Sequence, residues 1–483
     1  MKPTFLAAIV LSLALAGRAP AINLLVYNTN DSGAGSLRQC IADNAAPGGG
    51  STIIFSNVVT GAITLTNGEL LITNNVTILG PGANVLAING NAASCVFHIS
   101  NGVTTVISRL TITNGNTSGP GGGGIFNDDS TVTVSNCTLS GNSAGGGGGI
   151  YNNGSGSATL TLVASTLIGN SANLGGGILN EGTATLTVIA STFSGNSAGF
   201  IGGGIYNDGQ YANASVTVIT STFSSNSAAY VADAIYNHTC VPGNATLTVV
   251  ASTFSGNSAS QSGGIVNDAY SCPDIRSAGG GVHANSGSLT GATLEIGDTI
   301  LNAGGTGENV ANLGGTVISD GFNLSSDDGG GNLTNATDQI NIDPTLGPLQ
   351  DNGGPTLTHA LKVGSAAINK GDSFGLTTDQ RGYPRVYDFP GVAPATGGDG
   401  SDIGAYEAGD LLVTSAQRVG NSLQLGFTSW LGTNYEVQSR SDMTIGSWAS
   451  LPGSTSGNGG VASATVSNAF GQSQQFYRIH PVP

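Results

Sequence analysis

Residues 191–207 read STFSGNSAGFIGGGIYN. The stretch has no charged residue and holds five glycines and two asparagines. Glycine adopts left-handed backbone geometry freely, and asparagine tolerates it better than most residues. The stretch therefore predicts short extended segments that are separated by tight turns.

Both halves of this stretch recur along the chain. The last residue of the Thr-Phe-Ser-Gly-Asn half falls at Asn142, Asn170, Asn196, Asn226 and Asn257. The last residue of the Gly-Gly-Ile-Tyr-Asn half falls at Asn127, Asn152, Asn180, Asn207, Asn237 and Asn267. The copies of the first half are 26 to 31 residues apart, an interval typical of solenoids. The uneven interval indicates insertions in turns.

A third segment of each repeat alternates between apolar and polar residues, as in ATLTVI at 184–189 and ATLTVV at 245–250. Such alternation predicts a strand with one buried face. Three strands joined by Gly, Asn and Ser turns predict one coil of a right-handed parallel β-helix, with coils about 4.8 Å apart. We expect the six Ile-Tyr-Asn asparagines to form one ladder, and Phe193, Phe223 and Phe254 to stack inside the helix.

The rest of the chain indicates further segments. Ser36-Leu37-Arg38-Gln39 is a capping-box pattern that predicts a short helix in an N-terminal cap. Short alternating runs after residue 410 predict a small antiparallel β-sandwich. The predicted organisation is a signal peptide (1–21), a cap with the first coils (22–92), the β-helix repeats (93–325), a compositionally distinct segment (326–410) and the sandwich (411–483).

Charge and targeting signals limit the classes of function. Residues 1–21 have a basic start, an apolar run and a small-residue end, which is typical of an exported protein. No later stretch has the 18 apolar residues of a membrane-spanning helix. The net charge is −16, and no Lys or Arg lies between Arg109 and Arg276. This pattern argues against nucleic acid binding, and it favours attraction of cations such as calcium.

The chain has five cysteines and no Cys-x-x-Cys motif, which argues against a zinc site. Cys240 and Cys272 lie about one repeat apart, so we expect that they can pair in an oxidising compartment. Cys137 stands where the repeat places a core residue, and we expect a buried free thiol there.

Three sets of motifs resemble known families. The pairing of GGIY (203–206) with FSGN (193–196) resembles the repeat of polymorphic outer membrane proteins, which are surface-exposed β-helical adhesins. DSGAGSLRQCIADNAAP (31–47) is similar to the N-terminal CSLREA-type domain of bacterial surface proteins. DPTLGPLQDNGGPTLTHAL (343–361), TDQRGYPR (378–385) and SDIGAYE (401–407) together resemble the choice-of-anchor Q domain. These resemblances imply a secreted or cell-surface β-helix protein.

One turn position carries polar and charged residues in successive repeats, namely Asp128, Asn153, Glu181, Asp208, His238 and Asp268. Three interpretations stay open. The residues can simply suit a turn, or Asp128, Glu181, Asp208 and Asp268 can form a calcium-binding strip. Glu181 and Asp208 can also act as the paired carboxylates of a polysaccharide hydrolase, because stacked coils would place them about 5 Å apart.

The alternating segments also predict two outward ranks of hydroxyl groups. These ranks hold Thr159 and Thr161, Thr185 and Thr187, Ser215 and Thr217, and Thr246 and Thr248. Flat threonine arrays resemble the Thr-x-Thr faces of solenoid ice-binding proteins. An uncharged flat face also suits docking to a glycan or to another protein.

The sequence as a whole predicts a secreted or cell-surface β-helix protein that acts without catalysis, in adhesion or structural display. We expect no cofactor other than calcium, and partners that are glycans or surface proteins of a host or neighbouring cell. A carbohydrate-binding or polysaccharide-degrading enzyme is the alternative, and ice binding through the Thr-x-Thr face is a further one.

Overall fold

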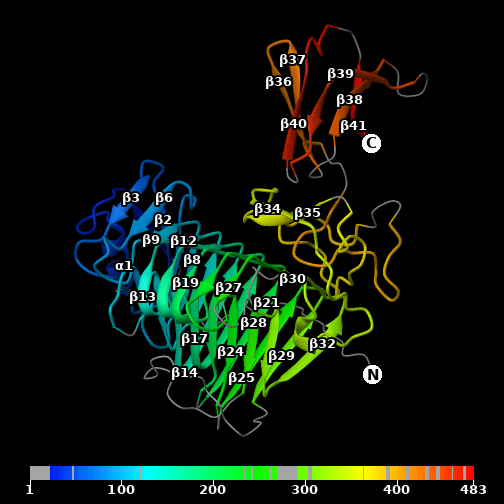
Figure 1. Cartoon of the computed structure of the whole chain (residues 1–483). Coiled ribbons are helices and arrows are strands. Elements are labelled where there is room, and N and C mark those ends of the chain that lie inside the picture. Colours follow the sequence, from blue (N-terminus) through cyan, green and yellow to red (C-terminus); the bar gives the residue numbers. More distant parts are fainter. Residues whose placement is uncertain are drawn as a thin grey trace.

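The repeats form a parallel β-helix of about ten coils in the computed structural model, which confirms the predicted fold class (Figure 1). The structure describes residues 22–483 except for 46–47, 120, 211, 233, 241–242, 260–263, 270–290, 303–306, 363, 388–391, 410–412, 430–433, 442–446, 459–460, 472–474 and 483. The expected signal peptide, residues 1–21, therefore lies outside the described residues. Within the described ranges, no helix has the length and apolar character needed to cross a membrane.

Two ladders share the longest sheet. The Ile-Tyr-Asn ladder holds β4 (Leu70–Ile72), β7 (Phe97–Ile99), β10 (Ile125–Asp128), the first parts of β14 (Ile150–Val163) and β17 (Ile178–Ile189), β20 (Ile205–Asp208), β24 (Ile235–His238), β28 (Ile265–Asp268) and β31 (Val310–Leu313). The threonine ladder holds β1 (Asn23–Val26), β2 (Ser51–Phe55), β5 (Val76–Leu79), β8 (Thr104–Ser108), β11 (Thr131–Ser135), the second parts of β14 and β17, β21 (Asn213–Ile219), β25 (Asn244–Val250), β29 (Ala292–Gly297) and β32 (Thr316–Gly321).

Two further sheets complete the coils. The Thr-Phe-Ser sheet holds β3 (Gly61–Thr64), β6 (Leu86–Asn89), β9 (Thr111–Thr113), β12 (Thr138–Ser140), β15 (Thr166–Ile168), β18 (Thr192–Ser194), β22 (Thr222–Ser224), β26 (Thr253–Ser255), β30 (Ile300–Asn302) and β33 (Leu324–Ser325). The Ser-Ala sheet holds β13 (Ser143–Gly146), β16 (Ser171–Leu174), β19 (Ser197–Ile201), β23 (Ser227–Ala228) and β27 (Ser258–Ala259).

The Ser-Ala sheet corrects the expectation of three strands in each coil. In five coils the chain forms a fourth short strand after the Gly-Asn turn, as at Ser197–Ile201. The alanine of this strand points inward, and Ala198 is 5% exposed. Because the inward residue that all five strands share is only an alanine, the strand leaves a weak hydrophobic signal in the sequence.

Aromatic and amide side chains stack along the helix axis. The rings of Phe193 and Phe223 are parallel with centroids 4.6 Å apart, and those of Phe223 and Phe254 are 4.8 Å apart. In the Ile-Tyr-Asn ladder each buried amide donates to the next, as from Asn180 Nδ2 to Asn207 Oδ1 over 2.7 Å. The same ladder bonds join Asn127, Asn152, Asn180, Asn207, Asn237 and Asn267. A second buried ladder joins Asn142, Asn170, Asn196, Asn226 and Asn257.

The glycines of the repeat make this close stacking possible. A Cβ atom added at Gly204 would lie 2.5 Å from the carbonyl oxygen of Ala234 in the next coil, and 3.1 Å from the ring of Phe223. Real Cβ atoms do not approach a carbonyl oxygen so closely, so only glycine fits at position 204, although the equivalent position of the next coil holds Ala234. The glycine-rich stretch is therefore a packing requirement of the stacked coils.

The helix is closed at both ends. Helix α1 (Leu37–Ala45) lies in the N-terminal cap, where its buried residues Leu37, Cys40 and Ile41 join the main core. Asp31 fixes this cap, since its carboxylate accepts hydrogen bonds from the Arg38 side chain and from the backbone N–H groups of Thr66 and Asn67. At the other end, a short 3₁₀ turn η2 (Gly329–Gly331) precedes Leu333, which is buried in the same core.

The last third of the chain forms two bodies of different character. In the described part of residues 344–408 there is one pair of strands, β34 (Leu346–Gln350) with β35 (Thr358–Leu361), and this segment lies along the Thr-Phe-Ser sheet (Figure 1). The predicted sandwich is present as two antiparallel sheets, one of β36 (Val413–Val419), β37 (Ser422–Thr428) and β40 (Val461–Val466) and the other of β38 (Asn434–Arg440), β39 (Ala449–Ser456) and β41 (Phe476–Val482). They share a core that contains Phe427, Tyr435 and Ile479.

Candidate functional site

The predicted turn column is a true column in the structure. Register pairs join Asp128 to Asn153, Asn153 to Glu181, Glu181 to Asp208, Asp208 to His238 and His238 to Asp268. These residues hold the last position of the Ile-Tyr-Asn ladder, inside β14 and β17 and at the ends of the other strands, and their side chains point away from the core. Asp208, His238 and Asp268 are nonetheless 2%, 4% and 8% exposed.

Two carboxylates of this column accept hydrogen bonds from tyrosines of the preceding coil. In that coil, each tyrosine lies two residues before the column position. The hydroxyl of Tyr151 donates to Glu181 Oε2 over 2.5 Å, and that of Tyr236 donates to Asp268 Oδ2 over 2.5 Å. Asp208 Oδ1 lies 3.5 Å from His238 Nδ1. The rings of Tyr236 and His238 stack with centroids 5.5 Å apart. The column is thus part of an aromatic and polar network that joins adjacent coils.

Burial keeps the tyrosine hydroxyls of this network protonated. Burial, followed by the charge of Asp208, raises the pKa of Tyr206 well above its ordinary value. Burial and the charge of Asp268 do the same to the pKa of Tyr236. Both hydroxyls therefore remain hydrogen-bond donors toward the neighbouring acids at any physiological pH.

Glu181 and Asp208, the candidate catalytic pair, are register neighbours, but their contacts run in opposite directions along the axis. Glu181 is bonded to Tyr151 of the preceding coil, whereas Asp208 lies against His238 of the following coil. A hydrolase must bring both carboxylates to one glycosidic bond. The burial of Asp208 leaves little surface for a sugar chain to reach, so this geometry favours a structural role for the pair.

The candidate calcium ligands Asp128, Glu181, Asp208 and Asp268 are distributed over six coils. Among the described residues, no group of three or more His, Cys, Asp or Glu side chains is arranged to hold a metal ion. The calcium-binding strip of Asp128, Glu181, Asp208 and Asp268 stays a prediction.

The cysteines divide into two kinds. Cys240 is disulfide-bonded, whereas its expected partner, Cys272, lies outside the described residues. Cys40, Cys95 and Cys137 are buried free thiols. Burial raises the pKa of Cys137 to about 11, so this thiol stays protonated and unreactive, in agreement with the expected core position.

The outward face of the threonine ladder forms a second, larger candidate site. Its first rank runs in register through Thr104, Thr131, Thr159, Thr185, Ser215, Thr246, Thr293 and Thr316. Its second rank runs through Thr133, Thr161, Thr187, Thr217 and Thr248. A third, apolar rank of Val163, Ile189, Ile219 and Val250 lies beside them. We call this surface the hydroxyl face.

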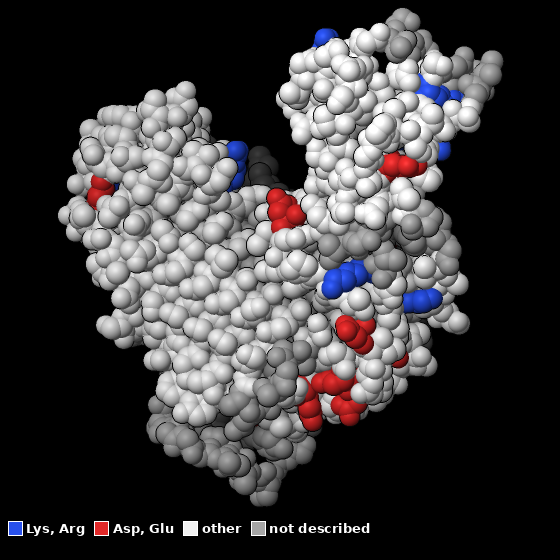
Figure 2. Space-filling model, turned by 45° about the horizontal axis from the view of Figure 1, so that its top comes forward, with Lys and Arg blue, Asp and Glu red and all other residues white. Residues whose placement is uncertain are grey.

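The hydroxyl face is flat and uncharged. Five members of the first rank are exposed, namely Thr104, Thr131, Thr185, Thr246 and Thr316, and the rest of the two ranks is half-exposed. From β8 to β25 no outward residue of the three ranks carries a charge, and the first acid in register is Glu295. In the view of Figure 2 the coils are likewise uncharged, and Asp, Glu, Lys and Arg gather near the ends of the helix and on the segments that follow.

A buried polar joint connects residues 344–408 to the helix, and no single motif of the sequence predicted it. Gln380 Nε2 donates to Thr192 Oγ1 over 2.9 Å, and its Oε1 accepts from Thr222 Oγ1 over 2.6 Å. His359 Nδ1 lies 2.7 Å from the carbonyl oxygen of Gly347 and so carries the proton, which leaves Nε2 to accept from Ser224 Oγ. The outward Thr and Ser of the repeat thereby bind the segment.

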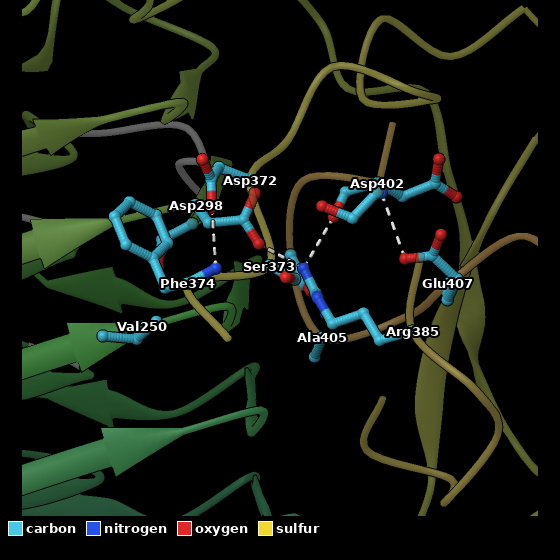
Figure 3. A network of polar contacts seen from close by, with 12 residues as sticks. Val250, Asp298, Asp372, Ser373, Phe374, Arg385, Asp402, Ala405 and Glu407 are labelled. Atoms are coloured by element: carbon cyan, nitrogen blue, oxygen red, sulfur yellow. Dashed lines mark hydrogen bonds and ion pairs between the residues drawn. The ribbon is translucent and has the colours of Figure 1, made fainter. Parts of the chain in front are cut away.

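Charged groups complete this joint (Figure 3). Arg385 forms an ion pair with Asp298, which belongs to the turn between β29 and β30, and both side chains are 0% exposed. Arg385 also donates to the carbonyl oxygens of Asp402 and Gly404. Glu407 accepts hydrogen bonds from the backbone N–H groups of Tyr387 and Asp402. The pair Arg381–Asp379 is buried in the same segment.

The joint predicts that stability falls as the pH rises from 5 to 8. Burial raises the pKa of Glu407 from 4.5 to about 7, and burial also raises the pKa of Asp402. A group whose folded pKa is raised favours folding below its unfolded pKa and loses that contribution as the pH passes the folded value. We expect the free energy of unfolding to fall by roughly 2–3 kcal/mol between pH 5 and pH 8.

Urea unfolding at a series of pH values measures this effect. Three other acids have pKa values that are lowered from 3.8, namely Asp31, Asp327 and Asp399. Their contribution to the free energy of unfolding is lost only at more acidic pH, so they do not affect the slope between pH 5 and pH 8. A Glu407→Gln variant should have a flatter profile between pH 5 and pH 8. An unchanged slope in that variant would assign the pH dependence to other groups.

No protein-family model matches this chain, and no curated protein matches it.

Proposed function

We propose that this protein is a secreted or cell-surface binding protein that uses the hydroxyl face to attach to an extended ligand, without catalysis, in adhesion or structural display. The observation that carries this proposal is the uncharged hydroxyl rank, which runs in register through eight coils from Thr104 to Thr316. At about 4.8 Å per coil this rank is roughly 34 Å long.

The chemistry of the face suits a glycan or an uncharged protein surface. Each threonine offers one hydroxyl donor and acceptor beside a methyl group. Sugars present the same mixture of hydroxyl groups and apolar C–H patches. Because β-branched residues in strands have few rotamers, the face is ordered before it binds and loses little side-chain entropy on binding.

Three observations support an extracellular location. The expected signal peptide at residues 1–21 implies export. Cys240 is disulfide-bonded, and disulfides persist mainly in oxidising compartments. The motifs that resemble the CSLREA-type domain, the choice-of-anchor Q domain and the polymorphic outer membrane protein repeat also belong to secreted and surface proteins.

We expect the double variant Thr161→Lys/Thr217→Lys to bind its glycan or cell-surface ligand at least about tenfold more weakly. Both threonines lie in the second rank of the hydroxyl face, and two lysines there would oppose close contact and bury unpaired charge. The matched control is Asn173→Lys/Ala229→Lys, which adds the same charge at exposed positions beside the Ser-Ala sheet.

Surface binding of the labelled protein to glycan arrays and to whole cells measures this difference. Similar thermal unfolding of both variants and of the wild-type protein shows that the fold is retained. If the control loses binding as strongly as the hydroxyl-face variant, the effect belongs to added charge in general, and the proposed site is wrong.

The hydrolase alternative depends on Glu181 and Asp208. If the protein is a binding protein, Glu181→Gln and Asp208→Asn leave ligand binding unchanged and no glycan is shortened by the wild-type protein. New reducing ends that disappear in either variant would support the enzyme instead.

Ice binding is a second candidate, and the in-register pairing of the two threonine ranks favours it. Threonines are about 4.8 Å apart within each rank, and the two ranks are about 6.6 Å apart along a strand. Together they form a regular lattice of hydroxyl and methyl groups. Thermal hysteresis in a freezing solution tests this function. Its loss in Thr161→Lys/Thr217→Lys, and not in the control variant, would assign the activity to this face.

A further inference from the structure

The C-terminal sandwich differs in charge from the rest of the molecule. The whole chain carries a net charge of −16, yet residues 411–483 contain three arginines and only two acids, Glu436 and Asp442. In Figure 2 the visible charges of this module are mostly basic. Each of the three arginines lies over an aromatic ring, Arg418 over Phe470 and both Arg440 and Arg478 over Trp448.

One sheet of the sandwich gathers two of these arginines on its outer face. Tyr435, Val437 and Ile479 point into the sandwich core, so the alternating residues of β38 and β41 point outward. Arg440 ends β38, and Arg478 lies in β41 opposite Gln438. The guanidinium carbons of Arg440 and Arg478 are 5.3 and 4.7 Å from the centre of the Trp448 ring.

The orientation of Arg478 leaves donors available. Its Nε donates to Gln438 Oε1 over 2.8 Å, and within the described part of the chain its two terminal nitrogens have no hydrogen-bond partner. The residue is exposed. A guanidinium that is held on one side by an amide and on one face by an indole ring loses little entropy when it binds an anion. Its free edge matches the two oxygens of a carboxylate or sulfate.

One acid, Glu436, lies on the same outward face of the sheet. The carboxylate of Glu436 accepts hydrogen bonds from Gln438 and Ser450, and lies 3.8 Å from His480. These contacts hold Glu436 within the sheet. We name Arg440, Trp448, Arg478 and His480 the arginine–tryptophan face.

We propose that the arginine–tryptophan face binds an acidic polysaccharide through its carboxylate or sulfate groups. Charge complementarity points to this partner, because the chain as a whole has a net charge of −16, whereas the exposed guanidinium of Arg478 is oriented over Trp448 in a module with three arginines and two acids. The exposed part of the indole ring offers an apolar surface to a pyranose ring. This binding is independent of the hydroxyl face and gives the protein a second attachment of different chemistry.

The test compares binding of the full chain to polygalacturonate, dextran sulfate and neutral dextran at low salt. We expect binding to both acidic polymers and not to neutral dextran, and a decrease as salt is raised. Arg478→Gln should weaken binding about tenfold or more, since a charged hydrogen bond contributes about 1.5–3 kcal/mol. Trp448→Ala should weaken it as well, because the ring orients both arginines.

Arg418→Gln is the matched control, since Arg418 also lies over an aromatic ring, 4.4 Å from the centre of Phe470, but on the other sheet. The proposal predicts that this variant and Thr161→Lys/Thr217→Lys bind acidic polymers as the wild-type protein does. Equal loss in Arg418→Gln, equal binding to neutral dextran, or no binding of the wild-type protein would each overturn it. Tighter binding to duplex DNA than to either polysaccharide would also overturn it.

Discussion

Replacing Arg385 with methionine is expected to lower the free energy of unfolding by about 3–5 kcal/mol, the usual cost of leaving a buried charge without its partner. Arg385 and Asp298 form a fully buried ion pair between residues 344–408 and the helix. The variant also removes the donor to the carbonyl oxygens of Asp402 and Gly404. Urea unfolding at pH 7 measures the loss, and protease cleavage within 344–408 should become faster.

A double variant separates the charge effect from the loss of packing. Asp298→Asn/Arg385→Met has no unpaired charge at this position, so it should recover part of the stability that Arg385→Met loses. Lys370→Met is the control, since Lys370 belongs to the same segment but its ammonium donates to Ala393 at the exposed surface. If Arg385→Met is as stable as Lys370→Met, the buried pair does not hold the segment on the helix.

Replacing Phe223 with alanine is also expected to cost about 3–5 kcal/mol. Its ring is fully buried between those of Phe193 and Phe254, with centroids 4.6 and 4.8 Å away. The cavity cannot collapse easily, because the coils above and below are held at fixed spacing by the asparagine ladders. Thermal and urea unfolding measure the loss.

Phe200→Ala is the matched control for this prediction. Phe200 lies in β19 and stacks on Tyr230 with centroids 5.9 Å apart, but it is 40% exposed. Its removal leaves no closed cavity and should cost much less than the removal of Phe223. Equal costs at the two positions would contradict the claim that burial inside the stack of rings sets the cost.

The features that the sequence predicted are those in which one residue type repeats at one position. Asn180 and Asn207 have the same neighbours in every repeat, so their ladder follows directly from alignment of the repeats. Phe193 and Phe223 follow in the same way. The short cap helix was predicted from Ser36, whose hydroxyl accepts from the backbone N–H of Gln39.

Features that depend on contacts between distant or dissimilar residues were not predicted. The turn before the Thr-Phe-Ser sheet has left-handed geometry at Ala190 and Thr220, which are residue types that give no signal of it. Gln380 binds Thr192, which lies 188 positions earlier, and no local sequence pattern predicts such a contact. The burial of Asp208 likewise depends on how the turns pack, and the spacing of the repeats does not reveal it.

The measurement that tests the central claim most directly is binding of residues 22–483 to a glycan array, with and without calcium, followed by mass spectrometry of every bound glycan. We expect binding that Thr161→Lys/Thr217→Lys abolishes and Asn173→Lys/Ala229→Lys retains, with each glycan recovered intact. Calcium dependence would implicate the acidic turn column in the same event. Shortened glycans, or binding that survives in the hydroxyl-face variant, would contradict the proposal that this β-helix attaches to its ligand through the hydroxyl face without catalysis.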